Sequence, residues 1–124
     1  MNGIHGSKTW FVADCFWPEI TTEGHYVSHE AICVLNTQAQ DAHIRLTLYF
    51  EDRAPMEGFE ALCPARRTHH VRLDKLTGAK GNHIPMGVPY AVMVQSDVPV
   101  IVQYSRLDTT QANESLMTTM AHPL

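Results

Sequence analysis

Apolar and polar residues follow one another in short segments along the chain, and turn signals separate these segments. The clearest segment is Ala42–Phe50, in which apolar and polar side chains alternate. A period of two is typical of a strand with one buried face. The buried face of this strand is predicted to carry Ile44, Leu46, Leu48 and Phe50, and the other face His43, Arg45, Thr47 and Tyr49.

A second informative run covers residues 90–108. It predicts two strands, Tyr90–Gln95 and Val100–Arg106, joined by a tight corner at Ser96–Pro99. Burying a polar side chain without a partner costs roughly 1–3 kcal/mol. The polar groups of this run therefore need partners in the same chain, in a second subunit or in a ligand. These groups are Gln95, Ser96, Gln103, Arg106 and Asp108.

The remaining segments complete the prediction of an all-β sandwich of about seven strands. Glycine and proline exclude a long regular element from residues 74–89, and residues 51–58 are predicted as a loop. Asp108, a good N-cap residue, introduces a predicted short helix over Thr109–Met120. The length of 124 residues fits one domain over residues 1–124. The other predicted strands are Thr9–Ala13, His25–Leu35, Phe59–Cys63 and Arg66–Leu73.

Composition and charge narrow the function classes. The net charge is −4 and the pI is about 6.0, which argues against a nucleic-acid binder, since such proteins carry a basic footprint. Charged residues make up only 18% of the chain, and such a low fraction favours subunit contacts. One strand is locally basic and is either a solvated face or a surface for anions and polar ligands. Its residues are Arg66, Arg67, His69, His70 and Arg72.

The cysteines and the N-terminus predict a soluble cytoplasmic protein. Cys15, Cys33 and Cys63 are widely spaced and form no Cys-x-x-Cys motif, so we expect buried, reduced thiols. The N-terminal residues lack the basic start and apolar stretch of a signal peptide. No apolar run approaches the ~20 residues that a membrane span needs.

The histidines and the Ser28-His29-Glu30 triplet do not form a familiar catalytic or metal-binding motif. His25 and His29 lie about 13 Å apart on a strand at ~3.3 Å per residue, and the adjacent His69 and His70 point to opposite faces. We therefore predict no metal and no cofactor. Neighbouring strand residues alternate faces, so Ser28 and His29 cannot easily act as nucleophile and base. Phosphate-loop and nucleophile-elbow motifs are also missing from the sequence.

Ligand binding is the better-supported hypothesis. Ser28 and Glu30 share one strand face, and we expect this face to meet Arg66, Arg67 or His70 across the sheet. Aromatic rings beside such polar groups suit a sugar-like ligand, because rings cover C–H surface and charged groups bind hydroxyls. The alternative is that the rings are core and that Glu30 forms an internal or intersubunit ion pair with arginine. The rings in question are Trp10, Trp17 and Tyr26.

In its strand segments the chain resembles the sensory rhodopsin transducer family, small soluble proteins named for the partner of a cyanobacterial sensory rhodopsin. The resemblance covers most of the chain from Tyr26 onward, in matching order. The matching segments are Tyr26–Asn36 (YVSHEAICVLN), Asp41–Phe50 (DAHIRLTLYF), Pro64–Leu73 (PARRTHHVRL), Ile84-Pro85, Val94–Asp108 (VQSDVPVIVQYSRLD) and Gln111-Ala112.

The resemblance implies a jelly-roll-like sandwich assembled as a homotetramer, in a soluble cytoplasmic protein that relays the signal of a membrane photoreceptor. It also implies binding of a small molecule, a sugar or a related metabolite, because many members occur without a rhodopsin. The motif positions that would line such a site are Ser28, His29, Glu30, Asn36, Arg66, Arg67, His70, Gln103, Arg106 and Asp108.

Three functional hypotheses follow. The first is a non-enzymatic signalling or ligand-binding module. The second is a carbohydrate-acting enzyme of the mutarotase or isomerase type, with His29 or His70 and Glu30 as acid and base. The third is DNA binding through Arg66, Arg67 and Arg72, against which the acidic balance of the chain argues.

Overall fold

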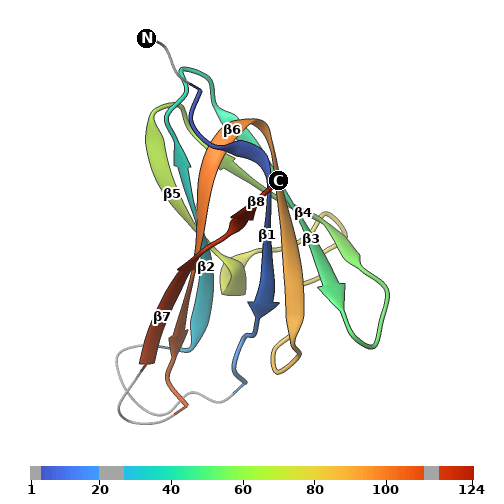
Figure 1. Ribbon diagram of the computed structural model, residues 1–124. Coiled ribbons are helices and arrows are strands. Elements are labelled where there is room, and N and C mark those ends of the chain that lie inside the picture. Colours follow the sequence, from blue (N-terminus) through green and yellow to red (C-terminus); the bar gives the residue numbers. More distant parts are fainter. Residues whose placement is uncertain (1–3, 20–26, 111–114) are drawn as a thin grey trace.

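The computed structural model describes residues 4–19, 27–110 and 115–124, and these residues form an all-β sandwich (Figure 1). The all-β prediction is therefore confirmed. One short 3-10 turn, η1 at Leu73–Lys75, follows the fifth strand. The eight strands of the described residues are β1 Ser7–Cys15, β2 His29–Asn36, β3 Ala42–Phe50, β4 Met56–Cys63, β5 Arg67–Arg72, β6 Tyr90–Asp108, β7 Ser115–Met120 and β8 His122–Pro123.

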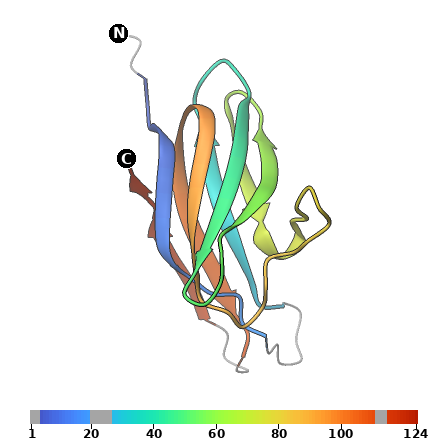
Figure 2. The ribbon, with the colours of Figure 1, turned by 90° about the vertical axis from the view of Figure 1, so that its right-hand side faces the viewer.

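The strands form two antiparallel layers that share β6. The first layer, on the right in Figure 1, has the order β4-β3-β6-β1-β8, and the second layer, on the left, has the order β5-β2-β6-β7. The first part of β6 pairs with β1 and β3, whereas residues from Ile101 onward pair with β2 and β7. The predicted corner at Ser96–Pro99 is where β6 changes layers, although the structure makes it one strand of 19 residues. Figure 2 shows β6 bending over at this end of the sandwich.

The core lies between the two layers, and β3 supplies its centre as the alternation predicts. Ile44, Leu46 and Leu48 are at most 1% exposed. Phe50 is half-buried and packs against the core, and Thr47 on the other face is also buried. Burial of apolar side chains at roughly 25 cal/mol per Å² is the main force that holds the layers together.

Several predicted boundaries move. β2 starts at His29, since Val27 and Ser28 lie outside the strand, and His25 falls outside the described residues. β4 starts at Met56, so the predicted loop before it is shorter. Residues 74–89 hold no long element, as expected, and contain an isolated bridge between Thr77 and His83.

The helix predicted over Thr109–Met120 is wrong. Residues Ser115–Met120 form β7, which pairs antiparallel with the second part of β6. The segment, Ser-Leu-Met-Thr-Thr-Met, has few apolar residues that a helix could bury against the core. As a strand it is held instead by the backbone hydrogen bonds of its neighbour β6. The Thr118 hydroxyl donates to the Tyr104 carbonyl at 3.1 Å and supports the pairing.

The prediction of buried, reduced thiols holds for two of the three cysteines. Cys15 and Cys63 are buried free thiols, while Cys33 is a free thiol that is only half-buried. Within the described part of the chain, no helix is long and apolar enough to span a bilayer.

Candidate functional site

The ten predicted site residues fall into three separate groups. Glu30 pairs with Arg106 of β6 at one end of β2, and Asn36 pairs with Arg67 of β5 at the other end. Six residues of strand separate these pairs by about 20 Å at ~3.3 Å per residue. The expectation that Glu30 meets Arg66 and Arg67 is therefore wrong, because β5 aligns Arg67 with the far end of β2.

The first group, at the end of β2, is made by Asn36, Arg66 and Arg67. Asn36 is buried, and its amide donates to the Gln40 and Cys63 carbonyls at 2.8 and 3.2 Å. This amide ties two loops together. Arg66 adopts a left-handed conformation with φ 56°, and both arginine side chains are exposed.

The second group lies on the outer face of the second layer. His70 and Gln103 flank Cys33 in register, and the Gln103 amide donates to the Thr118 hydroxyl at 2.8 Å. His29 belongs to this face, and its Nδ1 lies 2.9 Å from the Val27 carbonyl. His29 and Glu30 thus point to opposite sides of β2, so the geometry gives no support to an acid–base pair of these two residues.

The third group surrounds Glu30, which lies between the layers and is 1% exposed. Its Oε1 accepts a hydrogen bond from the Tyr90 hydroxyl at 2.7 Å. Its Oε2 accepts from the Tyr104 hydroxyl and from the Phe16 amide, the latter at 2.9 Å. These three donors come from both parts of β6 and from the segment that follows β1. We call Glu30, Tyr90, Tyr104 and Arg106 the glutamate cluster.

Arg106 links the glutamate cluster to the surface. Its Nε donates to the Tyr104 hydroxyl at 3.1 Å, and its guanidinium lies 5.7 Å from the centre of the Tyr104 ring. Its Nη2 donates to the Asp14 carbonyl at 3.4 Å and lies 3.8 Å from the Asp14 carboxylate. Arg106 thus pairs with Asp14, and the Asp108 carboxylate instead accepts from the Thr110 amide at 2.9 Å.

Burial controls the protonation of this cluster. Removal from water raises the pKa of Glu30, and the donated hydrogen bonds together with Arg106 oppose this rise. Burial and the nearby Glu30 carboxylate raise the pKa of both tyrosines, so Tyr90 and Tyr104 remain neutral donors. Burial also raises the pKa of the Cys15 thiol beside them, which makes this thiol unreactive.

Ser28 and Asp108 lie at the same end of the sandwich. The Ser28 hydroxyl is 2.9 Å from the Thr109 hydroxyl and accepts from the Thr109 amide at 2.9 Å. This contact fixes the end of β6 beside the start of β2. Hydrogen bonds with the side chain and the amide of Thr110 lower the pKa of Asp108.

A β-bulge in β1 shapes the surface above the glutamate cluster. Val12 pairs with Val92 and Cys15 pairs with Tyr90, so two residues of β1, Ala13 and Asp14, stand opposite Ala91 alone. A bulge re-aims side chains. Here it keeps Val12 and Cys15 buried while the Asp14 side chain is 92% exposed.

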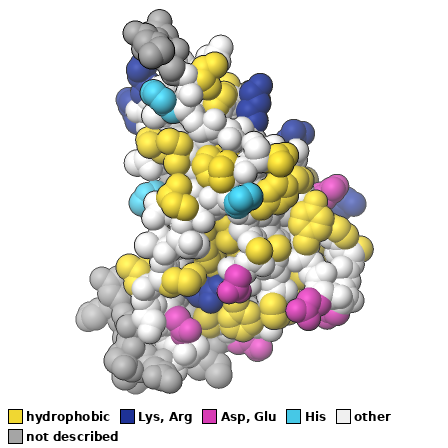
Figure 3. All heavy atoms as spheres, viewed as in Figure 1, with side chains coloured by type: hydrophobic (Ala, Val, Ile, Leu, Met, Phe, Trp, Pro, Cys, Tyr) yellow, Lys and Arg dark blue, Asp and Glu magenta, His cyan; other side chains and the backbone are white. Residues whose placement is uncertain are grey.

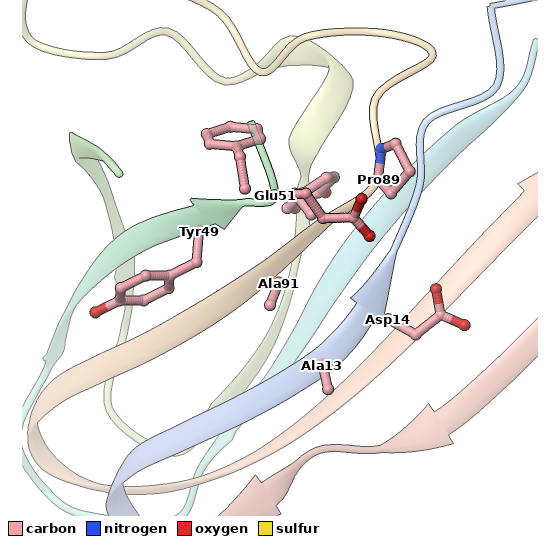
Figure 4. A pocket seen from close by; sticks show the side chains of 8 residues that line it. Ala13, Asp14, Tyr49, Glu51, Pro89 and Ala91 are labelled. Carbon is pink, nitrogen blue, oxygen red and sulfur yellow. The ribbon is translucent and has the colours of Figure 1, made fainter. Parts of the chain in front are cut away.

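The bulge borders a hollow of about 410 Å³, which we call the end hollow. Figure 4 shows Ala13 and Ala91 between the Tyr49 ring and the carboxylates of Asp14 and Glu51. Acidic side chains gather at this lower end of the molecule in Figure 3. Its lining residues are Ala13, Asp14, Tyr49, Phe50, Glu51, Pro89, Tyr90 and Ala91.

Two residues connect the end hollow to the glutamate cluster. Tyr90 lines the hollow and donates its hydroxyl to Glu30, while Asp14 lines the hollow and contacts Arg106. Asp14, Tyr90 and Tyr104 were not predicted from the sequence as members of the site. The two tyrosines bear hydroxyls within apolar strand segments, so their need for a buried partner was a usable signal.

Of the three aromatic residues predicted to hold a ligand, the two that the structure describes do not share a site. Trp10 is buried and donates its ring N–H to the Ser7 and Val100 carbonyls, each at 3.0 Å, so it is a core residue. Trp17 is half-buried and donates to the Ser28 carbonyl at 3.0 Å. Tyr26 lies outside the described residues. In the part of the chain that the structure describes, no three His, Cys, Asp or Glu residues are placed to hold a metal ion.

Comparison with known proteins gives a consistent result. A family model described as Anabaena sensory rhodopsin transducer matches residues 5–123. The crystal structure of Thermotoga maritima 1070 is 38% identical, with a TM-score of 0.86 over 98% of this chain and 97% of that one. The structure of the Anabaena sensory rhodopsin transducer is 36% identical, with a TM-score of 0.74 over 88% of this chain and 95% of that one. No curated protein sequence matches the chain.

Proposed function

Because this chain belongs to the sensory rhodopsin transducer family, we propose that it is a non-enzymatic relay module. In this proposal it binds a sugar-like small molecule in the end hollow and transmits the bound state to a partner. The partner class is a membrane photoreceptor, by extension from the similar Anabaena protein named as a sensory rhodopsin transducer. The module acts in the cytoplasm as a homotetramer.

The observation that carries the proposal is the connection between the end hollow and the glutamate cluster. Tyr49 and Phe50 offer ring surface, and Asp14 and Glu51 offer acceptors for hydroxyl groups. Sugars are bound by this combination of rings and charged side chains. Ala13 and Ala91 leave the floor of the hollow free of large side chains.

The glutamate cluster supplies the route of the relay. Glu30 joins the two parts of β6 through Tyr90 and Tyr104, and β6 is the strand that belongs to both layers. A ligand that moves Tyr90 or Asp14 would alter these hydrogen bonds. It shifts the population of arrangements only by its difference in affinity between them.

The ten residues predicted to bind a ligand divide into those near the end hollow and those far from it. Ser28, Glu30, Arg106 and Asp108 lie at the hollow end and hold the surfaces around it in position. A ligand contact by residues elsewhere stays a prediction, since those residues would need a second site. These residues are His29, Asn36, Arg66, Arg67, His70 and Gln103.

Calorimetry against a panel of mono- and disaccharides tests the proposal. We expect at least one sugar to bind the wild type, and Tyr49→Ala and Glu51→Gln each to weaken binding about tenfold, the equivalent of about 1.4 kcal/mol. The matched control is Glu60→Gln, an exposed change on the same layer outside the hollow. Absence of binding by every sugar, or equal loss in the control, would refute a sugar site here.

A second measurement addresses the non-enzymatic part. Interconversion of sugar anomers is followed by NMR with the wild type and with buffer alone. Equal rates agree with a binding module. A rate above buffer that is lost in Glu30→Gln would establish the carbohydrate-acting alternative instead.

A further inference from the structure

The two layers have four edge strands among the described residues, and three of them carry features that prevent further strand pairing. Edge strands expose unpaired N–H and C=O groups, and proteins block them with charge, proline, bulges or shortness. β8 is only two residues long and contains Pro123. β4 carries Glu57 and Glu60 and pairs with β3 through a bulge. β5 is basic, with Arg67 and Arg72 at its ends.

The fourth edge strand, β7, has none of these features. Its sequence, Ser-Leu-Met-Thr-Thr-Met, contains no charge, proline or glycine, and all six residues are exposed. Leu116 is 74% exposed and Met120 is 56% exposed. An uncharged, exposed edge of this length is a template for addition of another strand.

The hydrogen bonds of β7 identify the groups that are open for pairing. The Ala121 amide donates to the Val102 carbonyl at 3.2 Å, so this position points toward β6. Backbone direction alternates along an antiparallel strand, so Met117 and Thr119 also point toward β6. The N–H and C=O groups of Leu116, Thr118 and Met120 therefore point away from β6, along the free edge.

We propose that β7 pairs antiparallel with β7 of a second copy of this chain, in a register centred on Thr118. This register brings Leu116 opposite Met120 of the second copy, and Thr118 opposite its own counterpart. Apolar and Thr–Thr cross-strand pairs are favourable, and no like charges meet because the strand has none. The arrangement is an isologous two-fold contact that closes both edges at once.

The residues of β7 complement one another in this register, so a second copy of the chain fits the edge better than an unrelated strand. Each β7 offers the same alternating open groups that its partner needs, and both members of the Leu116–Met120 pair lie on the outer face. The inference rests on the self-assembly part of the proposed function and assigns one interface to it. It joins the second layers of two copies into one continuous sheet.

Cysteine cross-linking tests the register. A hydrogen-bonded antiparallel pair has its Cα atoms about 5.5 Å apart, which is within disulfide reach. We expect mild oxidation of Thr118→Cys to give a disulfide-linked dimer in high yield. Leu116→Cys is the matched control, because its two copies would lie about 13 Å apart in this register. The wild type, with its half-buried Cys33, controls for the native thiols.

Native mass spectrometry of the protein without cross-links distinguishes a wrong β7 interface from a wrong prediction of self-assembly. We expect the wild type to be oligomeric and the double variant Leu116→Lys with Met120→Lys to lose one level of association. An oligomer unchanged in the variant, without a Thr118→Cys cross-link, would overturn the β7 interface and leave the assembly intact. A monomeric wild type would overturn both. Cross-linking of Leu116→Cys equal to that of Thr118→Cys would refute the register.

Discussion

At the scale of single residues, the charge of Glu30 depends on two opposing effects. Burial between the layers disfavours the carboxylate, and the hydroxyls of Tyr90 and Tyr104 with the Phe16 amide favour it. Burial is the larger effect, so the pKa of Glu30 lies above its usual value of 4.5. The folded protein therefore binds this proton more tightly than the unfolded chain does.

The raised pKa predicts the sign of a pH effect. Where the folded state binds more protons, the free energy of unfolding falls as pH rises, by at most about 1.4 kcal/mol per pH unit for one proton. We expect Glu30 to stabilise the fold most below about pH 4.5 and to lose this contribution as pH rises toward its folded pKa. The stability of the wild type minus that of Glu30→Gln should therefore decrease with pH above 4.5.

Urea unfolding at several pH values measures this difference. Hydrogen bonds lower the pKa values of Asp97 and Asp108, so these residues contribute stability that increases with pH. Both contributions cancel when the stability of the variant is subtracted from that of the wild type. Glu60→Gln, an exposed glutamate outside the cluster, is the control variant. A difference that stays flat or rises for Glu30→Gln would mean that the carboxylate is better solvated than its burial indicates.

At the scale of elements, the sequence predicts strands whose pattern is local. β3 matches its predicted bounds because one side of the strand faces the core, and apolar and polar residues therefore alternate along its sequence. β7 was missed because both of its sides are exposed, so burial leaves no period in its sequence. The corner of β6 was predicted from its polar and proline residues, but its passage between layers depends on pairing with four other strands.

The candidate site was predictable only in part for the same reason. That Glu30 is buried and needs partners follows from its place in an apolar strand. Its partners, Tyr90 and Tyr104, are 60 and 74 residues away in the sequence. Which residues stand opposite one another depends on strand order and register, and no local pattern encodes these. The prediction that Glu30 meets Arg67 is wrong because the strand register could not be read from the sequence.

The entry of β1 beside the corner of β6 gives a prediction for Gly6. Gly6 has a positive φ of 95°, and a Cβ atom there would overlap the Val100 carbonyl. We expect Gly6→Ala to lower the free energy of unfolding by about 2–4 kcal/mol, from backbone strain and displacement of β6. Gly81→Ala is the control, since φ is also positive but no atom lies within 4 Å. It should lose only about 1 kcal/mol. Equal losses in denaturant unfolding would show that the contact with Val100 is unimportant.

At the scale of the whole molecule, the two candidate ligand regions differ in charge. The end hollow carries Asp14 and Glu51, and the opposite end of β2 carries the exposed Arg66 and Arg67. The net charge of −4 adds a weak field that favours cations. The charge of a bound sugar should therefore report which end of the sandwich binds it.

We expect an amino sugar to bind more tightly than the uronic acid of the same skeleton if the ligand occupies the end hollow. One charge pair at 4 Å contributes about 1 kcal/mol in water, so Asp14 and Glu51 together, at about 2 kcal/mol, should produce a preference of roughly thirtyfold. Calorimetry at low salt and at high salt measures it, and salt should reduce the preference because these carboxylates are exposed. Glu51→Gln should also reduce it. Tighter binding of the uronic acid, lost in Arg67→Ala, would instead place the ligand at the basic end, where the strand register holds Arg67 beside Asn36.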